Sequence, residues 1–402
     1  MIQRLNIAMI SIHSCPIAVL GGRDTGGMNV YVRELAAELS KRGHSIDIYT
    51  KAHQPQHGPA INLGQNVRII HLDTGVDEDM PKIAIYDYIQ KLANVAENFR
   101  KYSQLQYDLI HSHYWLSGLI GKELQTLWHV PHATMFHTLG AIKNSLGIGE
   151  REPELRIESE KEVISTVDRI IASTTRESKE LVRLYSASQE KITVIPCGVN
   201  LNLFKPVDKE IARRELGLDH QKVILFVGRM DPLKGLEQLL AAMTYMDGKK
   251  PPLLMIVGGD GYSRVQVEEL KRLAEELNAR DRVKFVGPIA QSQLPLFYSA
   301  ADVCVIPSYY ESFGMVALES LACGTPIVAT NVGGMKNIIR NDEMGRITGD
   351  NSPQSLAGEI SELIRLPDDE AQIKIRRDTV AEFSWAAIAD KIIDEYYRLI
   401  DG

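Results

Sequence analysis

The sequence contains little cysteine, no excess of positive charge and no long apolar run. Its four cysteines are far apart, with no close pair at the spacing of metal ligands, so we expect a reduced, cytoplasmic setting. The net charge of −7 argues against nucleic acid as the main partner, because a phosphate backbone attracts a basic surface. No stretch reaches the roughly 18 apolar residues of a membrane span, and the apolar start has the length of a strand, not of a signal-peptide core. We therefore expect no integral membrane contact.

Two chemical motifs are also missing. The first glycine-rich loop lacks the Gly-x-Gly-x-x-Gly spacing of dinucleotide enzymes, which disfavours a nicotinamide-dependent dehydrogenase. No Asp-x-Asp motif directly follows a predicted strand. Asp77 and Asp79 lie in a predicted loop, and Asp368 with Asp369 begins a late helix. We therefore expect no required cofactor and no essential divalent metal.

What the chain does have is an alternation of short apolar runs and longer amphipathic segments. Between the first two runs, Val32, Leu35 and Leu39 fall on one face of a helix that ends at Gly43. Such alternation predicts α/β structure, with parallel sheets covered on both faces by helices. The predicted strands begin at Leu5, Ser45, Asn66, Tyr107, His132, Asp168 and Lys191, and in a second series at Lys222, Leu253, Arg282, Asp302 and Pro326.

The 402 residues exceed what one hydrophobic core usually organises, and a turn-rich stretch from Pro196 separates the two series of strands. We therefore expect two doubly wound domains that face one another, with the cleft between them as the binding site. A last amphipathic segment begins at Ser384 and has no strand after it.

The glycine-rich loop, residues 21–32 (GGRDTGGMNVYV), follows the first predicted strand and leads into a helix. Glycines there let backbone N–H groups approach an anion, and the start of the helix adds positive potential. A flexible turn explains the glycines equally well.

Two carboxylates stand near the start of a later helix. Glu311 follows a predicted strand, and the helix is predicted to begin near Phe313, which places Glu319 about two turns further on. Carboxylates accept hydrogen bonds from sugar or ribose hydroxyls, and free backbone amides donate them. A pair of solvated glutamates at an ordinary helix start is the alternative.

A basic loop, residues 228–235 (GRMDPLKG), directly follows the first strand of the second series. Arg229 and Lys234 flank a proline-containing turn and can converge on one anion. A departing diphosphate gains negative charge as a glycosidic bond breaks, and fixed cations stabilise that charge. Two ordinary surface cations are the alternative.

Two histidine-containing loops follow predicted strands of the first series. HSHYWLSG begins at His111, and FHTLGAIKN begins at Phe136. Both lie at carboxyl ends of strands, where open α/β sheets place ligands. His113 or His137 is therefore a candidate for hydrogen bonding to a sugar or for acid–base chemistry, or it merely caps a local turn.

Taken together, these motifs resemble glycosyltransferase family 4, of GT-B fold, over essentially the full length of the chain. Glu311 and Glu319 match the family's E-x7-E element, and GRMDPLKG matches its phosphate-binding loop. The glycine-rich and histidine-containing loops are similar to those of the subgroup that holds the inositol-phosphate N-acetylglucosaminyltransferase of mycothiol synthesis. Sucrose-phosphate synthases and sucrose synthases are close relatives of that subgroup.

The resemblance implies two Rossmann-like domains, with a C-terminal helix that crosses back onto the first. Residues 1–197 and 384–402 then form an acceptor-binding domain, and residues 198–383 a donor-binding domain. The implied reaction is a retaining transfer of a hexosyl or N-acetylhexosaminyl group from a UDP-sugar. The implied route is same-face attack through an oxocarbenium-like state, because no carboxylate nucleophile is evident. The subgroup also leads us to expect a homodimer.

The resemblance assigns donor-site roles position by position. Gly27 would offer its backbone to the diphosphate, Arg229 and Lys234 would neutralise it, Glu319 would hold the ribose hydroxyls, and Ile289 would contact uracil through its backbone. His137 would lie near the C6 hydroxyl of the transferred sugar. The other implied contacts of that sugar are Glu311 and the amides of Phe313, Gly314 and Met315. The implied catalytic residues are Arg229, Lys234, Glu311 and His137.

The subgroup binds the phosphate of its acceptor with a Lys, a Tyr, a Thr and an Arg. The matching positions are Lys82, Tyr114, Thr138 and Arg156, and Asn29 would lie beside the acceptor ring. A phosphate is a remote handle whose binding energy can orient the reacting hydroxyl. Inositol phosphate, fructose 6-phosphate and other phosphorylated polyols all fit, because the loop after His137 differs from both close relatives.

Three other functions compete with this one. The nearest is glucosyl transfer to fructose 6-phosphate or fructose, of the kind that sucrose-phosphate synthase or sucrose synthase performs. A sugar-nucleotide epimerase shares the two-domain shape, but the E-x7-E element together with GRMDPLKG speaks against it. A non-catalytic nucleotide-sugar-binding protein would show a degenerate site, whereas every expected position is filled.

Overall fold

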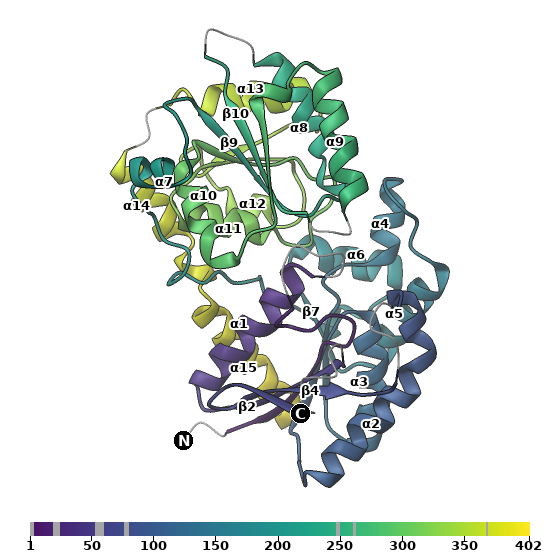
Figure 1. Ribbon diagram of the computed structural model, residues 1–402. Coiled ribbons are helices and arrows are strands. Elements are labelled where there is room, and N and C mark those ends of the chain that lie inside the picture. The colour runs from purple at the N-terminus through teal and green to yellow at the C-terminus, as the bar shows by residue number, and fades with distance from the viewer. Residues whose placement is uncertain are drawn as a thin grey trace. The chain divides into compact units, whose positions relative to one another are not determined.

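The computed structural model describes residues 4–18, 25–52, 60–75, 80–246, 250–259, 263–366 and 369–402. It divides into two compact units (Figure 1). The first unit comprises Gly27–Pro196 and Trp385–Gly402 together with the start of the chain, and the second includes Cys197–Ser384. In the described residues, no helix combines the length and the apolar character that crossing a membrane requires.

The first unit is built on an eight-stranded sheet in the order β3-β4-β2-β1-β5-β6-β7-β8. Neighbouring strands are parallel, except that β3 runs antiparallel to β4. The strands are β1 (Asn6–Ile10), β2 (Ser45–Lys51), β3 (Ala60–Gly64), β4 (Val67–Leu72), β5 (Leu109–His113), β6 (His132–Met135), β7 (Arg169–Ala172) and β8 (Ile192–Val194). The predicted runs of this series all form strands. The apolar pattern missed β3, because this edge strand is largely exposed.

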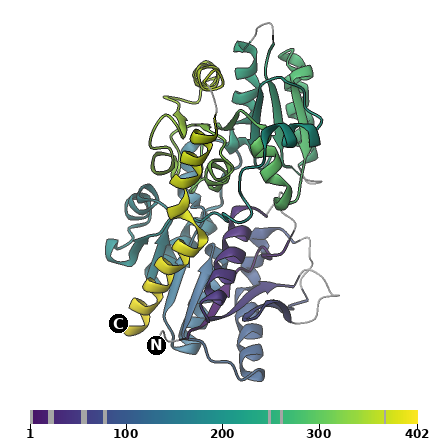
Figure 2. The same cartoon turned by 90° about the vertical axis from the view of Figure 1, so that its left-hand side faces the viewer.

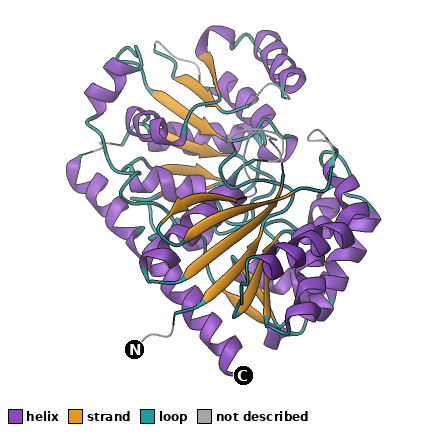
Figure 3. Cartoon of the chain, turned by 60° about the horizontal axis from the view of Figure 1, so that its bottom comes forward, coloured by secondary structure: helices purple, strands orange, loops and turns teal. Residues whose placement is uncertain are grey.

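Helices flank this sheet (Figure 3). They are α1 (Gly27–Lys41), α2 (Ile89–Tyr102), α3 (Trp115–Trp128), α4 (Gly140–Leu146), α5 (Glu154–Thr166), α6 (Thr175–Tyr185) and α15 (Trp385–Asp401), with short 3-10 turns η1 (Lys82–Tyr88) and η2 (Gln189–Lys191). As predicted, α1 buries Val32, Leu35 and Leu39 on one face. The chain leaves that helix through Gly43, whose φ of 91° favours glycine.

The last helix, α15, lies beside α1 in the first unit (Figures 1 and 2). The rings of Tyr31 and Trp385 meet edge to face at 5.2 Å, and Arg42 pairs with Asp390 at 2.7 Å. Its apolar face buries Ile388 and other side chains against the first unit. The expectation of a terminal helix that returns to the first unit is confirmed, and this burial is why a helix without a following strand is stable there.

The second unit has a six-stranded sheet in the order β11-β10-β9-β12-β13-β14, and its neighbouring strands are parallel. The strands are β9 (Val223–Val227), β10 (Leu253–Val257), β11 (Val283–Gly287), β12 (Val303–Ile306), β13 (Ile327–Ala329) and β14 (Gly345–Ile347). The longer helices are α7 (Lys209–Glu215), α8 (Leu236–Ala242), α9 (Arg264–Glu276), α10 (Leu294–Ala300), α11 (Met315–Ala322), α13 (Pro353–Leu363) and α14 (Glu370–Thr379). The short strand β14 was not predicted, because its three residues carry no apolar run.

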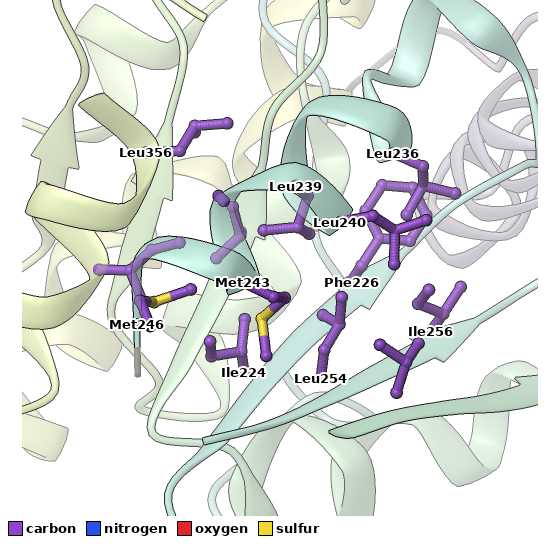
Figure 4. Packing of buried hydrophobic residues seen from close by; sticks show 14 of the residues in the cluster. Ile224, Phe226, Leu236, Leu239, Leu240, Met243, Met246, Leu254, Ile256 and Leu356 are labelled. Atoms are coloured by element: carbon purple, nitrogen blue, oxygen red, sulfur yellow. The ribbon is translucent and has the colours of Figure 1, made fainter. Parts of the chain in front are cut away.

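Shorter turns complete the second unit. They are η3 (Pro232–Lys234), η4 (Met243–Tyr245), η5 (Arg280–Arg282), η6 (Gln291–Gln293), α12 (Met335–Ile338) and η7 (Ala381–Phe383). The core between the sheet and α8 joins Ile224 and Phe226 of β9 with Leu254 of β10 and with Leu239 and Leu240 of α8 (Figure 4). Each such side chain contributes about 1.5–3 kcal/mol when fully buried. This packing fixes the carboxyl end of β9, from which the basic loop emerges.

Candidate active site

Lys234 and Glu311 are joined in the structure. The Nζ of Lys234 donates to Oε1 of Glu311 at 2.6 Å, and Ser308 Oγ donates to the same oxygen at 2.9 Å. Lys234 follows β9, whereas Glu311 follows β12, and these two strands are parallel neighbours in the sheet. Parallel neighbours bring their carboxyl ends to one edge, which is why residues 77 positions apart meet.

The last glycine of the basic loop makes this meeting possible. Gly235 has a φ of 67°, and a Cβ at this position would lie 2.0 Å from the carbonyl oxygen of Pro307. The backbone N–H of Tyr309 also donates to the carbonyl of Leu233 at 2.8 Å. The two loops therefore pack backbone against backbone, and only glycine fits at the contact.

Arg229 has a different partner from Lys234. Its guanidinium lies 3.4 Å from the carboxylate of Asp231, and the Arg229 side chain is 44% exposed. Asp231 also caps η3, since its Oδ1 accepts from the N–H of Leu233 at 2.9 Å. The two cations thus lie in one loop with separate carboxylate partners.

The helix that carries Glu319 starts close to the predicted position. α11 begins at Met315, two residues after Phe313, and its N-cap Gly314 takes up a left-handed conformation with a φ of 108°. Glu319 is 7% exposed and accepts a hydrogen bond from the hydroxyl of Tyr298 at 2.8 Å. The Glu311 side chain is 15% exposed. Neither glutamate is therefore a solvated surface residue.

The remaining donor-site predictions fall on both units. Ile289 follows β11 and is partly buried, and Met315 is partly buried at the start of α11. Phe313 is buried against Phe383, with ring centroids 6.0 Å apart. In the first unit, Gly27 begins α1 and is exposed. Residues 21–24 of the glycine-rich loop and Asp77, Asp79 and Asp368 lie outside the described residues, while Asp369 caps α14.

His113, the last residue of β5, and His137, in the loop after β6, lie side by side. Nδ1 of His113 and Nε2 of His137 are 3.0 Å apart, although 24 residues separate them in sequence. His137 has a φ of 60°, and its ring meets that of Tyr31 edge to face at 5.2 Å. Burial lowers the pKa of His137 to about 3, so this imidazole is neutral near pH 7.

Four predicted acceptor-site residues, Lys82, Tyr114, Thr138 and Arg156, are linked to one another. The guanidinium of Arg156 lies 4.8 Å from the centroid of the Tyr114 ring, and Nζ of Lys82 lies 5.4 Å from it. Nη2 of Arg156 also donates to the carbonyl and hydroxyl oxygens of Thr138, at 2.8 and 3.0 Å. These residues come from η1, the end of β5, the loop after β6, and α5. Two cations and two hydroxyls therefore share one small region.

Arg156 is more enclosed than the sequence suggested. Its side chain is 2% exposed, and it pairs with Glu160 at 2.8 Å and with Glu152 at 2.9 Å. Glu160 is fully buried and also accepts from the N–H of Gly140 and from the hydroxyl of Tyr185. We did not predict these partners. The signal was present, since both glutamates stand four residues from Arg156.

The side-chain amide of Asn29 holds the start of α1. Its amide nitrogen donates to Ser14 Oγ and to the carbonyl of Cys15, both at 2.7 Å. It is fully buried and ties α1 to the loop after β1. Within the described ranges, no three His, Cys, Asp or Glu side chains are grouped in a way that would hold a metal ion.

Comparison with known proteins identifies the family. Residues 25–203 match the model described as Glycosyltransferase Family 4, and residues 208–378 match that described as Glycosyl transferases group 1. A D-inositol 3-phosphate glycosyltransferase of Corynebacterium glutamicum (strain R) is 36% identical over 404 residues, which covers 98% of this chain and 96% of the relative.

Solved structures agree. A sucrose-phosphate synthase from Thermosynechococcus elongatus superimposes with a TM-score of 0.90 at 35% identity, covering 99% of this chain and all of that one. Anabaena HepE in complex with UDP and glucose shares the fold at 19% identity, with a TM-score of 0.75 over 98% of this chain and all of that one. This chain therefore belongs to glycosyltransferase family 4 and is an enzyme of its retaining, GT-B type.

Proposed function

We propose that this enzyme transfers a hexosyl or N-acetylhexosaminyl group from a UDP-sugar to inositol phosphate or a similar small phosphorylated acceptor. The observation that carries the proposal is that Lys82 and Arg156 both lie over the ring of Tyr114, while Arg156 also donates to the hydroxyl of Thr138. Cations and hydroxyl donors are the groups that bind a phosphate monoester. The name of the 36% identical relative supports the same acceptor class.

The Lys234–Glu311 pair supports a donor site in the second unit. In our proposal, Lys234 and Arg229 stabilise the departing diphosphate, while Glu311 accepts a hydrogen bond from the transferred sugar. The amides of Phe313, Gly314 and Met315 and the ring of His137 hold the other hydroxyls. Gly27, Ile289 and Glu319 bind the diphosphate, the base and the ribose.

The proposed step needs no covalent enzyme intermediate. The bond between the anomeric carbon and the diphosphate oxygen breaks, and the acceptor oxygen bonds to that carbon from the same face. The acceptor's proton passes to the departing phosphate oxygen. The protein contributes positioning and fixed positive charge, which is the main source of catalysis in such transfers.

Because two cations of the chain act on the diphosphate in this proposal, a divalent metal is not required. We expect turnover to survive prior treatment with EDTA and assay in metal-free buffer. Loss of turnover that added Mg²⁺ or Mn²⁺ restores would contradict this expectation. Treatment of an enzyme known to need Mg²⁺ serves as the control.

Transfer to fructose 6-phosphate is the second candidate, favoured by the TM-score of 0.90 and 35% identity to a sucrose-phosphate synthase. A mass-spectrometric screen separates the two. UDP-glucose and UDP-N-acetylglucosamine are each combined with inositol phosphate and fructose 6-phosphate, and with the unphosphorylated inositol and fructose as controls. Product from inositol phosphate alone supports the proposal, whereas product only from fructose 6-phosphate selects the second candidate. Failure of both phosphorylated acceptors, or equal use of the unphosphorylated ones, would overturn the assignment of the acceptor site.

A further inference from the structure

His113 stands in the middle of a row of buried imidazoles. It is the last residue of β5 and is fully buried. Its ring centroid lies 4.2 Å from that of His111 on one side, and its Nδ1 lies 3.0 Å from Nε2 of His137 on the other. His137 is only partly buried. The hydrogen bond therefore links a fully buried residue to one that is partly exposed.

The rings of this row are neutral near pH 7. Burial lowers the pKa of His111 and of His137 to about 3. Burial, followed by the charges that His111 and His137 would carry, also lowers the pKa of His113. Each neutral ring holds one proton, so the contact between His113 and His137 is a donor–acceptor pair with only two arrangements.

The second nitrogen of His113 decides between them. Its Nε2 is buried and has no hydrogen-bond partner among the residues that the structure describes. A proton on Nε2 would leave a buried N–H unsatisfied, which costs about 1–3 kcal/mol. With the proton on Nδ1, His113 donates to His137, and its Nε2 is an unprotonated acceptor without a hydrogen-bond partner. Unpaired buried acceptors are tolerated better than unpaired buried donors.

We infer that His113 is a positioning residue, which donates its Nδ1–H to Nε2 of His137 and so fixes the proton of His137 on Nδ1. His137 then meets a ligand as a hydrogen-bond donor, and it has no free ring nitrogen to accept a proton. It therefore orients an oxygen of the transferred sugar and does not act as a general base. In this last respect the inference rests on the proposed function.

The backbone at His137 requires such support. A φ of 60° is unusual for a residue with a side chain and costs of order 1–3 kcal/mol unless the surroundings hold it. The N–H of Thr138 donates to the carbonyl of Phe136 at 2.7 Å, which closes a tight turn around His137. Tyr31 packs against one side of the ring, and His113 holds Nε2. The ring is therefore held from two directions.

The test compares two replacements of His113. His113→Asn keeps an N–H close to the position of Nδ1, whereas His113→Leu removes it. We expect His113→Leu to lower kcat by about 10–100-fold, as loss of an orienting partner of a site histidine does, with the KM of the acceptor unchanged. His113→Asn should recover most of that loss. Equal kcat for His113→Leu and the wild type, or equal loss in both variants, would overturn the inference.

His132→Leu is the matched control. His132 is also fully buried, also neutral because burial lowers its pKa to about 3, and also hydrogen-bonded, to Ser112 Oγ at 2.8 Å. It begins β6, at the end of the strand away from His137. We expect this variant to lose thermal stability as His113→Leu does, but to keep its kcat at temperatures where both are folded. A loss of kcat as large as that of His113→Leu would show that the effect is general destabilisation.

A second measurement requires no substrate. NMR of the protein with ¹⁵N-labelled histidine reports which ring nitrogen carries the proton, and the His137→Gln spectrum assigns the His137 signals. We expect the proton of His137 on Nδ1, and its presence on Nε2 would overturn the inference. If the wild type transfers no sugar at all, the proposed function fails, while this spectrum still decides the state of His137.

Discussion

At Lys234 one ammonium group connects two loops that leave neighbouring strands of the second sheet. Lys234→Ala removes that charge from the proposed diphosphate site. We expect kcat to fall by about 10²–10³-fold, the usual cost of removing one group that stabilises developing charge. Steady-state kinetics with a UDP-sugar checks this prediction.

Lys271→Ala is the control for the Lys234 variant. Lys271 also pairs with a glutamate, Glu268, at 2.7 Å, but both residues belong to α9 and neither belongs to the basic loop. The Lys271→Ala variant should keep wild-type turnover. Lys271→Ala should unfold at nearly the wild-type temperature, whereas Lys234→Ala leaves Glu311 without its cation and should be assayed at a temperature where it is folded. Near-normal turnover of Lys234→Ala would remove Lys234 from the proposed mechanism.

Arg156 is too deeply buried for its alanine variant to be a clean test of acceptor binding. Replacing it with alanine would leave the fully buried Glu160 without its cation, and breaking a buried pair in this way costs about 3–5 kcal/mol. Loss of acceptor binding in that variant would be hard to separate from loss of folding. Lys82, which is only partly buried, offers a cleaner test of the same site.

We expect Lys82→Ala to raise the KM of the phosphorylated acceptor by about 10-fold or more, since one charge-assisted contact contributes roughly 1.5–3 kcal/mol. The KM of the donor should stay within about 2-fold. Kinetics with each substrate varied in turn checks this. Lys101→Ala, at a cation that is 67% exposed, serves as the control. Equal effects on both substrates would show that the acceptor phosphate binds elsewhere.

At the scale of elements, the start of α11 depends on one glycine. A Cβ on Gly314 would lie 2.1 Å from Cε of Met335, and the φ of 108° is strained for any other residue. We expect Gly314→Ala to lower the free energy of unfolding by about 1–3 kcal/mol or more, and to lower turnover because the adjacent amides shift. Chemical denaturation and kinetics check both effects.

Gly358→Ala is a second glycine-to-alanine substitution, and we expect it to raise the free energy of unfolding, not to lower it. Gly358 lies inside α13, and a Cβ there would meet no atom within 4 Å. Alanine should therefore stabilise the protein by about 0.5–1 kcal/mol through its higher helix propensity. If Gly314→Ala were as stable as Gly358→Ala, the close contact with Met335 would be wrong.

At the scale of the whole molecule, the first unit holds several histidines whose pKa is lowered by burial. Burial is the main cause that lowers the pKa of His13, His111, His113, His132 and His137. In the unfolded chain these histidines bind protons near their ordinary pKa of 6.5. In the folded chain the pKa is about 3 for His111, His132 and His137, and it is also lowered for the other two. Between these values the unfolded state binds more protons, so stability falls as the pH falls. In this window each such histidine lowers the free energy of unfolding by about 1.4 kcal/mol for every unit by which the pH falls.

We therefore expect the free energy of unfolding of the first unit to fall by several kcal/mol when the pH is lowered from 7.5 to 5.5. Glu160 and Glu177, whose pKa burial raises, act in the opposite direction but are only two. The three tryptophans, Trp115, Trp128 and Trp385, all belong to the first unit, so their fluorescence follows its urea denaturation. A denaturation midpoint that does not change over this pH range would contradict the neutral state of these histidines.

Local patterns in the sequence determined most of the fold. Apolar runs predicted the strands of both sheets except β3 and β14, because an exposed edge strand and a three-residue strand carry too little apolar signal. The spacing of Glu311 and Glu319 and the glycines of the basic loop indicated the family. Each of these signals lies within its own short stretch of chain.

Only the tertiary structure decided which side chains meet. His113 meets His137, Lys234 meets Glu311, and Arg156 reaches both Thr138 and the ring of Tyr114. These contacts join different strands and loops, and they depend on strand order and register. A local pattern states that a segment forms a strand, but long-range packing fixes its neighbour, and with it the protonation and the partners of each group in the site.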